Sequence, residues 1–298
     1  MAAAAPPLRI EGLVKDYGKV HAVRGIDLEI RPGEVFGFVG PNGAGKTTTI
    51  RCLLDLLRPT AGRIAILGLD PLRDGIAVRQ RVGYIPGELR LPERLTGRQF
   101  LHSIGRLRGG FDRRRVDELA ARFQLDLERP IRQLSSGNRR KVSVLSAFLT
   151  DVDLLILDEP TNGLDPLMQH EFLGLVRERQ AAGATVFLSS HILSEVQRVA
   201  DRVAVLRAGT IVALGSINEI RSRARQRVEI WFENDAPPGM VGLPGIEGAS
   251  VDGRRFVGLL SGSVRPLLDA LAGRPVVTLL IEDPDLEDAF LGLYEDGQ

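Results

Sequence analysis

The sequence predicts an α/β fold in which helices cover a mostly parallel central sheet. Three observations support this prediction. A strand, a glycine-rich loop and a helix follow one another over residues 35–57, a continuous apolar run at 154–157 is typical of a strand buried on both faces, and strand and helix patterns alternate after it. The alternating segments are strands at 184–188 and 203–206 and helices at 167–179 and 192–200.

Length and composition bound the class of protein. A chain of 298 residues with 44% hydrophobic residues suffices for about two globular domains. The 39 Lys and Arg residues nearly balance the 38 Asp and Glu residues, so no charge excess favours a nucleic-acid partner. The sequence lacks a basic leader, and no stretch approaches the ~18 apolar residues of a membrane span. We therefore expect a cytosolic chain, and any action at a membrane would require another polypeptide to span it.

The N-terminal region predicts a small antiparallel layer. Short, partly alternating apolar segments occur at 8–14, 20–23 and 26–30, and Pro32-Gly33 then turns the chain into the strand before the loop. Tyr17 stands beside a glycine after the first segment. It has two interpretations: a half-buried residue at a strand end, or a platform on which an adenine ring stacks.

Residues 40–48, GPNGAGKTT, match a phosphate-binding loop. The spacing of Gly40, four residues, Gly45, Lys46 and Thr47 is the pattern in which backbone N–H groups surround phosphates and the lysine reaches the terminal ones. Glycines let the backbone approach an anion closely, and the helix that follows adds the positive end of its dipole. Thr47 supplies a hydroxyl for Mg²⁺. The motif predicts a nucleotide site.

Two short strands and a long helical insert separate this loop from the apolar run. The strands are expected at 63–67 and 82–85, and residues 93–149 have a helical pattern. The insert is rich in arginine, which has two interpretations: a solvated helical face, or a docking surface for an acidic partner.

Polar residues follow two of the apolar strands. Asp158 and Glu159 come directly after the run at 154–157, and His191 follows the strand at 184–188. Ligands of open α/β sheets bind at the carboxyl ends of the strands. Asp158 is therefore expected to hold a metal ion, Glu159 to orient or deprotonate a water molecule, and His191 to reach a terminal phosphate.

The segment 134–141, LSSGNRRK, begins a helix with an unfavourable charge distribution. Ser135 or Ser136 can cap the helix, but three cations follow at the positive end of its dipole, where acidic residues are favoured. An inconsistency of this kind is expected where a bound anion completes a site. A capped helix with basic neighbours is also common on protein surfaces, so this alternative stays open.

The composition of the sequence changes after Gly215. A basic run at 221–227 and a Pro/Gly-rich stretch at 236–245 place a domain boundary near Arg221. We expect an N-terminal domain over residues 1–220, with a helical subdomain at about 93–149, and a small α+β domain over 221–298. In the second domain, strands are expected at 228–232, 255–260 and 276–281, with helices at 264–271 and from Asp285. The arginines of the basic run are interpreted as a solvated linker, with an anionic membrane surface as the alternative.

Taken together and in this order, these motifs resemble the ATP-binding subunit of ATP-binding cassette (ABC) transporters over roughly residues 8–220. Gly40 to Thr48 is similar to the Walker A loop, 154–158 to the Walker B strand, 134–138 to the family signature, and 162–165 to the D-loop. The resemblance assigns catalytic roles to Lys46, Glu159 and His191. It assigns nucleotide contacts to Tyr17, Gly40, Pro41, Asn42, Gly43, Ala44, Gly45, Lys46, Thr47, Thr48, Ser135, Ser136, Gly137, Asn138 and Asp165. Mg²⁺ is assigned to Thr47 and Asp158.

The resemblance also implies an assembly. Two subunits would form a head-to-tail dimer that encloses two ATP molecules, each between the Lys46 loop of one subunit and the Ser136-Gly137 segment of the other. The anion for the unusual helix start would then come from the partner subunit. The helical subdomain would receive a coupling helix from a separate transmembrane permease, which places the chain at the cytoplasmic face of the membrane.

Two positions depart from the family pattern. The signature is typically LSGGQ, whereas this chain has Ser136 and Asn138 at the third and fifth positions. This change is compatible with a functional homodimer or with the weakened half of a heterodimer. A glutamine is usual where this chain has Gly87, and the neighbouring Glu88 is the candidate substitute as a metal ligand.

The single cassette and the C-terminal extension look similar to bacterial ABC-2-type exporters of the drug-resistance kind. The expected function is ATP hydrolysis that drives export through a separate membrane partner. The alternative is a soluble ABC ATPase that acts as a nucleotide switch on the ribosome or on DNA.

Overall fold

A computed structural model describes residues 5–223 and 226–282. The chain divides into two compact units between Gly215 and Ser216. The division lies five residues before the boundary expected at 220/221.

An antiparallel layer forms one face of the first unit. Strands β1 (Leu8–Tyr17), β2 (Val20–Ile30) and β4 (Ala61–Ile66) pair in the order β2-β1-β4. The two segments expected at 20–23 and 26–30 belong to one strand, because Gly25 is a bulge: Leu13 pairs with Ile26 and Val14 with Arg24, which leaves Gly25 unpaired at φ 83°. One continuous strand therefore replaces the two expected segments.

The described strands of the central sheet run in the order β5-β6-β7-β3-β8-β9. Parallel pairing joins β3 to β7 and β8, and β6 to β5 and β7, which confirms the predicted parallel sheet. The bounds are β3 Val35–Val39, β5 Val82–Ile85, β6 Leu154–Asp158, β7 Thr185–Ser190, β8 Arg202–Arg207 and β9 Thr210–Ser216. Strand β9, which has one buried residue and lies at the end of this strand order, was not predicted.

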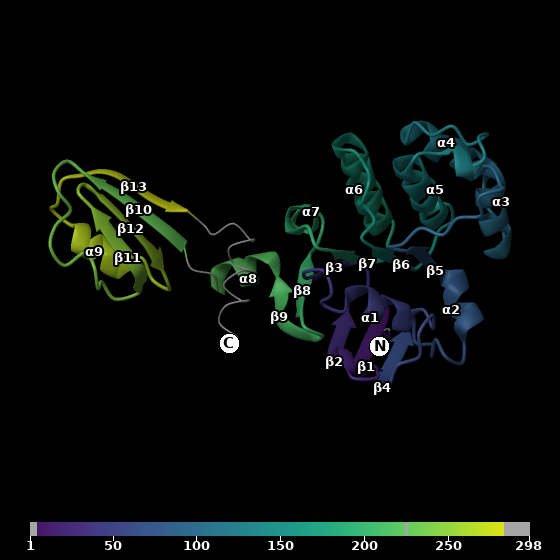
Figure 1. Cartoon of the computed structure of the whole chain (residues 1–298), viewed down its shortest axis with the longest axis horizontal. Helices are drawn as coiled ribbons and strands as arrows, with labels where there is room; N and C mark the ends of the chain where they lie inside the picture. The colour runs from purple at the N-terminus through teal and green to yellow at the C-terminus, as the bar shows by residue number, and fades with distance from the viewer. Residues whose placement is uncertain (1–4, 224–225, 283–298) are drawn as a thin grey trace. The chain divides into compact units, whose positions relative to one another are not determined.

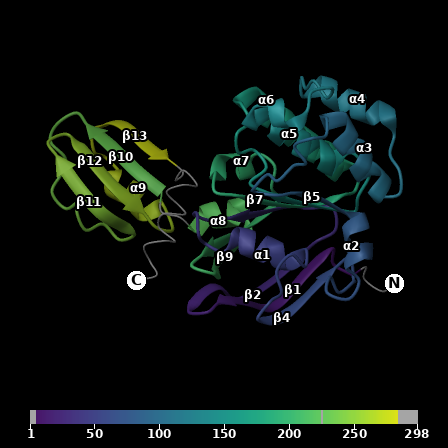
Figure 2. The same cartoon turned by 45° about the vertical axis from the view of Figure 1, so that its right-hand side comes forward.

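Helices cover both faces of this sheet. Helix α1 (Lys46–Leu53) lies between the sheet and the antiparallel layer, and a second group of helices covers the opposite face (Figures 1 and 2). That group contains α3 Gly97–Leu107, α4 Arg113–Arg122, α5 Ser136–Phe148, α6 Pro166–Ala181 and α7 Leu193–Gln197. Side chains from both sheets and α1 form a shared core, which includes Leu8, Phe38, Ile50 and Phe187. A short helix, α2 (Gly75–Arg81), precedes β5 and was not predicted.

The second unit contains the predicted strands and helix together with one strand that the sequence did not reveal. Helix α8 (Ile217–Arg223) opens it, and the strands β10 (Gln226–Phe232), β11 (Ile246–Asp252), β12 (Arg255–Leu260) and β13 (Val276–Glu282) pair in the order β11-β12-β10-β13. Its core joins Val228, Ile230 and Phe256 to Leu267 and Leu271 of α9 (Arg265–Leu271). The helix expected from Asp285 lies outside the described residues.

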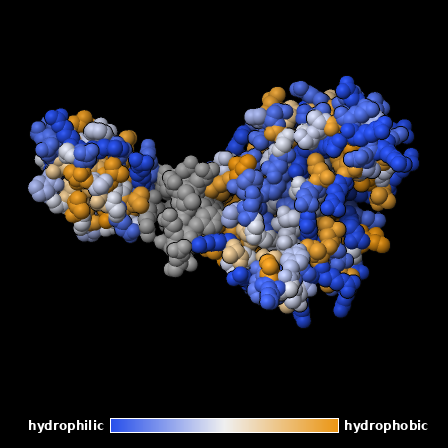
Figure 3. All heavy atoms as spheres, in the orientation of Figure 1, coloured by the Kyte–Doolittle hydropathy of each residue, from blue (hydrophilic) through white to orange (hydrophobic). Residues whose placement is uncertain are grey.

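Apolar side chains also reach the surface of the second unit. Trp231, Leu259 and Leu280 are 42%, 38% and 45% exposed. Figure 3 shows apolar residues among hydrophilic ones on the face that it draws. Across residues 5–223 and 226–282, no helix combines the length and the apolar character needed to cross a bilayer.

Candidate functional site

The phosphate-binding loop connects β3 to α1 through backbone that only glycine fits. Gly45 adopts φ 108° and Gly43 φ 83°. A Cβ atom on Gly40 would lie 2.3 Å from the carbonyl oxygen of Leu206, and one on Gly45 would lie 2.5 Å from that of Ala22. The sequence argument assigned these glycines to the approach of an anion. The structure adds a second reason, because neighbouring strands pack directly against the loop.

Lys46 is buried at the centre of the loop, with 5% of its surface exposed. Its Nζ atom donates to the carbonyl oxygens of Gly40 at 2.6 Å and Pro41 at 3.2 Å, and lies 3.2 Å from Oε1 of Glu159. An ammonium group has three donors, so these partners account for all of them. The lysine is thus held at the loop and joined to the end of β6.

Glu159 links the lysine to the predicted histidine. Its Oε2 atom lies 2.7 Å from Nδ1 of His191, while its backbone N–H donates to the carbonyl and hydroxyl oxygens of Ser189. The backbone adopts φ 46°, in the left-handed region that residues with a Cβ rarely occupy. Lys46 at the start of α1, Glu159 after β6 and His191 after β7 therefore meet in one cluster, joined through the Glu159 carboxylate.

Asp158 is fully buried beside this cluster and has one unsatisfied oxygen. Its Oδ1 atom accepts a hydrogen bond from Ser189 Oγ at 2.7 Å, and its Oδ2 atom is buried without a partner among the described residues. A buried carboxylate oxygen without a donor fits a metal ion. Within the described part of the chain, no group of three or more His, Cys, Asp or Glu residues could hold an ion by itself. One carboxylate and the Thr47 hydroxyl suit Mg²⁺, which takes its remaining ligands from water and phosphate.

Gly87 packs against the same carboxylate. A Cβ atom at this position would lie 2.9 Å from Oδ2 of Asp158, and no left-handed backbone angle requires the glycine. The side chain of Glu88 is 70% exposed, and its Oε2 atom lies 3.4 Å from Nη2 of Arg51. The candidate substitute for the metal ligand thus points to a surface arginine in this structure.

The start of α5 has the predicted cap but a different use for its cations. Ser135 Oγ accepts a hydrogen bond from the N–H of Asn138 at 3.2 Å, and Ser136 is exposed. Arg139 donates to the carbonyl oxygens of Ile131 and Arg132, and Arg140 to those of Pro86, Gly87 and Asn162. Backbone carbonyls of the same chain therefore bind both arginines, and the anion expected at this helix start stays a prediction.

Two other predicted residues have identifiable local roles. Tyr17 is 46% exposed and lies at the end of β1, where it pairs with Val20 of β2. Val20 precedes Ala22 by two residues, and the carbonyl group of Ala22 packs against Gly45. The tyrosine therefore belongs to a hairpin that borders the loop. Asp165 caps α6 by accepting a hydrogen bond from the N–H of Met168 at 3.0 Å.

The sequence argument missed a buried carboxylate next to the site. Glu195 of α7 accepts a hydrogen bond from Thr161 Oγ1 at 2.6 Å, and Ser190 Oγ lies 3.4 Å from the same oxygen. Burial raises the pKa of Glu195, and these hydrogen bonds oppose the shift. The sequence offered one signal for Glu195, which lies four residues after His191 on a helix that directly follows the end of a strand.

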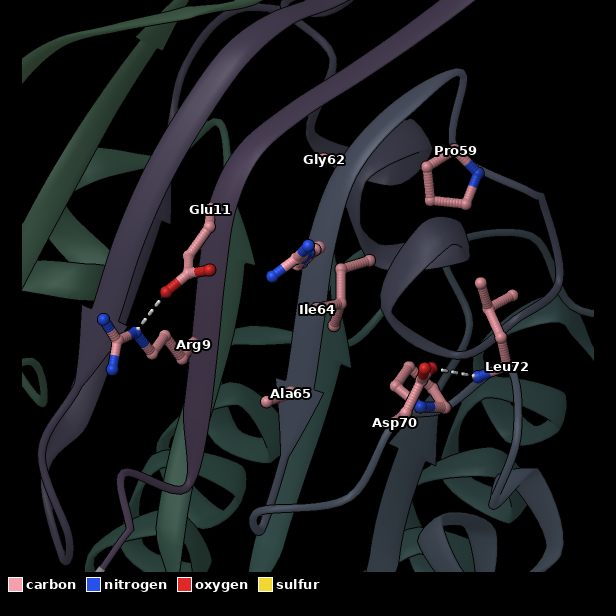
Figure 4. A pocket seen from close by; sticks show the side chains of 10 residues that line it. Arg9, Glu11, Pro59, Gly62, Ile64, Ala65, Asp70 and Leu72 are labelled. Carbon is pink, nitrogen blue, oxygen red and sulfur yellow. Dashed lines mark hydrogen bonds and ion pairs between the residues drawn. The ribbon is translucent and has the colours of Figure 1, made fainter.

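A pocket of about 400 Å³ lies away from these residues, on the antiparallel layer. Figure 4 shows Arg9 paired with Glu11 and Asp70 accepting a hydrogen bond from the N–H of Leu72. Both acidic groups already have partners, and none of the predicted site residues lines the pocket.

Comparison with known proteins gives the same family from the sequence and from the fold. A family model described as ABC transporter matches residues 23–162. The daunorubicin resistance ATP-binding protein DrrA3 of Streptomyces coeruleorubidus is 38% identical, with 98% of this chain and 96% of that protein aligned. The Nod factor export ATP-binding protein I of Cupriavidus metallidurans is 34% identical, with 96% of each chain aligned.

Solved structures match the first unit. One described as the ATP-binding subunit of an ABC transporter is 32% identical, has a TM-score of 0.65, and covers 72% of this chain and 91% of its own. A second, described as the dimeric post-hydrolysis state of an ATP-binding cassette, has a TM-score of 0.63 at 21% identity and covers 70% of this chain. The α/β prediction with an antiparallel layer and helical subdomain is confirmed.

Proposed function

This chain belongs to the ATP-binding proteins of ABC transporters, and on that premise we propose that its Lys46–Glu159–His191 cluster hydrolyses ATP to power export. The chain is an ATPase subunit whose relatives serve drug-resistance and Nod factor export, and a separate membrane partner carries the substrate. The observation that supports the proposed site best is the contact of Glu159 with both Lys46 and His191, at 3.2 and 2.7 Å. The remaining assignments below extend from it.

Nucleotide binding must rearrange this cluster. The ammonium group of Lys46 has no spare donor, so a terminal phosphate has to displace Glu159 or a loop carbonyl from it. A phosphate carries more negative charge than the carboxylate and binds a cation more strongly. ATP would thereby release Glu159 from the lysine and free one carboxylate oxygen to accept a proton from a water molecule.

His191 and Ser189 keep Glu159 in place during this exchange. The histidine side chain is 36% exposed, so it can contact both Glu159 and a phosphate that enters from solvent. Ser189 holds the N–H of Glu159 and, through its hydroxyl, Oδ1 of Asp158. One serine thus contacts the backbone of the proposed base and the carboxylate of the proposed metal ligand.

Asp158 and Thr47 are the proposed ligands of Mg²⁺. The unpartnered Oδ2 atom of Asp158 supplies an anionic oxygen, and Thr47 follows Lys46 on the first turn of α1. When bound, the ion would neutralise charge that develops on the phosphate oxygens.

The site of one subunit requires a second chain. Ser135, Ser136, Gly137 and Asn138 begin α5 at a distance along the chain from the loop, and Ser136 is exposed as a contact to a partner requires. The proposed assembly is a head-to-tail dimer, homomeric or heteromeric, bound to a permease at the cytoplasmic face of the membrane. ATP would lie between the Lys46 loop of one subunit and the signature segment of its partner.

The test is the substitution Glu159→Gln in the purified full chain. It keeps the size of the side chain and removes the base, so we expect ATP binding to persist, hydrolysis to fall by about 10²–10⁴-fold, and an ATP-dependent dimer to appear in size-exclusion chromatography. Glu171→Gln is the matched control, because this carboxylate lies on α6 and pairs with Arg122. Hydrolysis at the wild-type rate in Glu159→Gln would sink the assignment of the base.

Co-purification tests the partner. We expect tagged wild-type chain, recovered from its own cells in mild detergent, to carry a membrane protein with several spans. Recovery of ribosomes in its place would support the alternative of a nucleotide switch and overturn the transport proposal.

A further inference from the structure

Arg140 is a buried arginine that joins three separate segments of the first unit. Only 6% of its surface is exposed. Its Nε atom donates to the carbonyl oxygen of Asn162 at 3.0 Å, and its Nη1 and Nη2 atoms donate to those of Pro86 and Gly87, both at 2.8 Å. The planar guanidinium can hold acceptors in several fixed directions at once, which a lysine cannot.

Both turns that Arg140 holds adjoin the proposed catalytic groups. Pro86 and Gly87 follow β5, and the backbone of Gly87 packs so close to Oδ2 of Asp158 that a Cβ atom would lie 2.9 Å from it. Asn162 belongs to the turn that follows Glu159, and its N–H donates to the Glu159 carbonyl at 3.3 Å. The guanidinium thus fixes the backbone on two sides of the Asp158–Glu159 pair.

Burial and the nearby acidic residues act in opposite directions on the charge of Arg140. Among the described residues, no carboxylate lies within ion-pair distance of it, and burial lowers its pKa, whereas the charges of Asp158 and Glu159 favour its charged form. A buried cation with only carbonyl partners is costly in a merely structural role. The charges of Asp158 and Glu159, which belong to the site, offset part of this cost.

We propose that Arg140 is a positioning residue that couples the signature helix α5 to the metal end of the nucleotide site in the same subunit. The coupling runs through backbone, because Arg140 binds the carbonyl oxygens of Pro86, Gly87 and Asn162. The inference rests on the proposed function. In the proposed dimer, the start of α5 contacts the partner's nucleotide, so Arg140 links the two sites.

Arg140→Lys tests the proposal against a matched control. The variant keeps the charge and loses the three-way contact, so we expect kcat to fall about 10- to 100-fold and the Mg²⁺ concentration for half-maximal rate to rise, as is typical when an outer partner of a metal ligand is lost. Affinity for ATP without metal should stay near wild type, whereas the melting temperature should fall because buried carbonyls lose their donors. Arg139→Lys is the control: it is adjacent on α5 and also binds carbonyls, but those of the 3₁₀ turn Ile131–Gln133.

Gly87→Ala approaches the same contact from the other side. The three atoms nearest to the added methyl group would all belong to Asp158, so we expect the same loss of kcat and the same higher Mg²⁺ requirement. In the double variant the two losses should not add, because both act on one contact.

Three outcomes would overturn the proposal. They are a wild-type Mg²⁺ dependence in Arg140→Lys, an equal effect of Arg139→Lys, and additive losses in the double variant. A wild-type chain that binds no ATP would refute the proposed function instead, which distinguishes the two failures.

Discussion

Glu159 shows how a single residue can carry both strain and chemistry. A left-handed backbone costs a residue with a Cβ about 1–2 kcal/mol, and the two hydrogen bonds from its N–H to Ser189 hold it there. The consequence is that the chain leaves β6 in a sharp turn, and the Glu159 carboxylate reaches Lys46 and not the face of the sheet opposite Asp158. Adjacent residues on a strand point to opposite faces, so without this turn the two acids could not serve one site.

Glu195 should make the stability of the first unit depend on pH. Burial raises its pKa above the ordinary value of 4.5, so the folded chain binds this proton more tightly than the unfolded chain does. The free energy of unfolding should therefore fall as pH rises from about 4.5 through the folded pKa. Glu195→Gln removes this titration. We expect the melting temperature of the variant, relative to wild type, to increase over that pH range and then level off.

The hydrogen bond from Thr161 supplies the second variant of this experiment. Its hydroxyl stabilises the charged form of Glu195, so Thr161→Val should raise the pKa further and extend the fall in stability to higher pH. A difference between Glu195→Gln and wild type that stays constant from pH 4.5 to 8 would contradict the assignment.

At the scale of elements, the sequence predicted those whose pattern is local. The run at 154–157 became β6 because strands buried on both faces are continuously apolar, and the glycine-rich loop identified both β3 and α1. Elements at edges were harder. In α2 only Val78 is buried, and β11 has mostly exposed residues, so neither element has an apolar period that could be recognised.

The residues of the candidate site also divide into those that a local pattern identifies and those that it does not. Lys46, Asp158 and Glu159 were predictable because each stands next to an element with a clear local pattern. The role of Arg140 was not, since its partners lie 22 to 54 residues away in the chain and are carbonyl groups that every residue possesses. The sequence also did not reveal that backbone carbonyls bind the arginines at the start of α5, and the anion expected there stays a prediction.

Helix α6 allows the two roles of Asp165 to be separated. Its carboxylate caps the helix, so Asp165→Ala should lower the free energy of unfolding by about 1 kcal/mol, while Asp165→Asn should keep it because asparagine caps equally well. Urea denaturation measures both. We further expect Asp165→Asn to weaken the ATP-dependent dimer of the Glu159→Gln chain, because its proposed D-loop contact uses the charge. Undiminished dimer formation would show that Asp165 acts only as a helix cap.

For the whole molecule, each unit has a hydrophobic core of its own. The core of the first joins both of its sheets and α1, and that of the second packs one face of its sheet on α9. Every residue of the proposed site belongs to the first unit. ATP should consequently stabilise the first unit by mass action and leave the second unaffected.

Calorimetry of the Glu159→Gln chain tests this separation. With Mg²⁺ and ATP at 100 times the dissociation constant, the first unit should gain about 2.7 kcal/mol, and its transition alone should move to higher temperature. Phe256→Leu and Phe148→Leu are matched substitutions of buried phenylalanines in the second and first units. Each should cost about 1–3 kcal/mol and lower only its own transition. A single transition that ATP and both substitutions shift together would show that the two cores unfold as one, and the second unit would then have to be counted as part of the machinery that ATP drives.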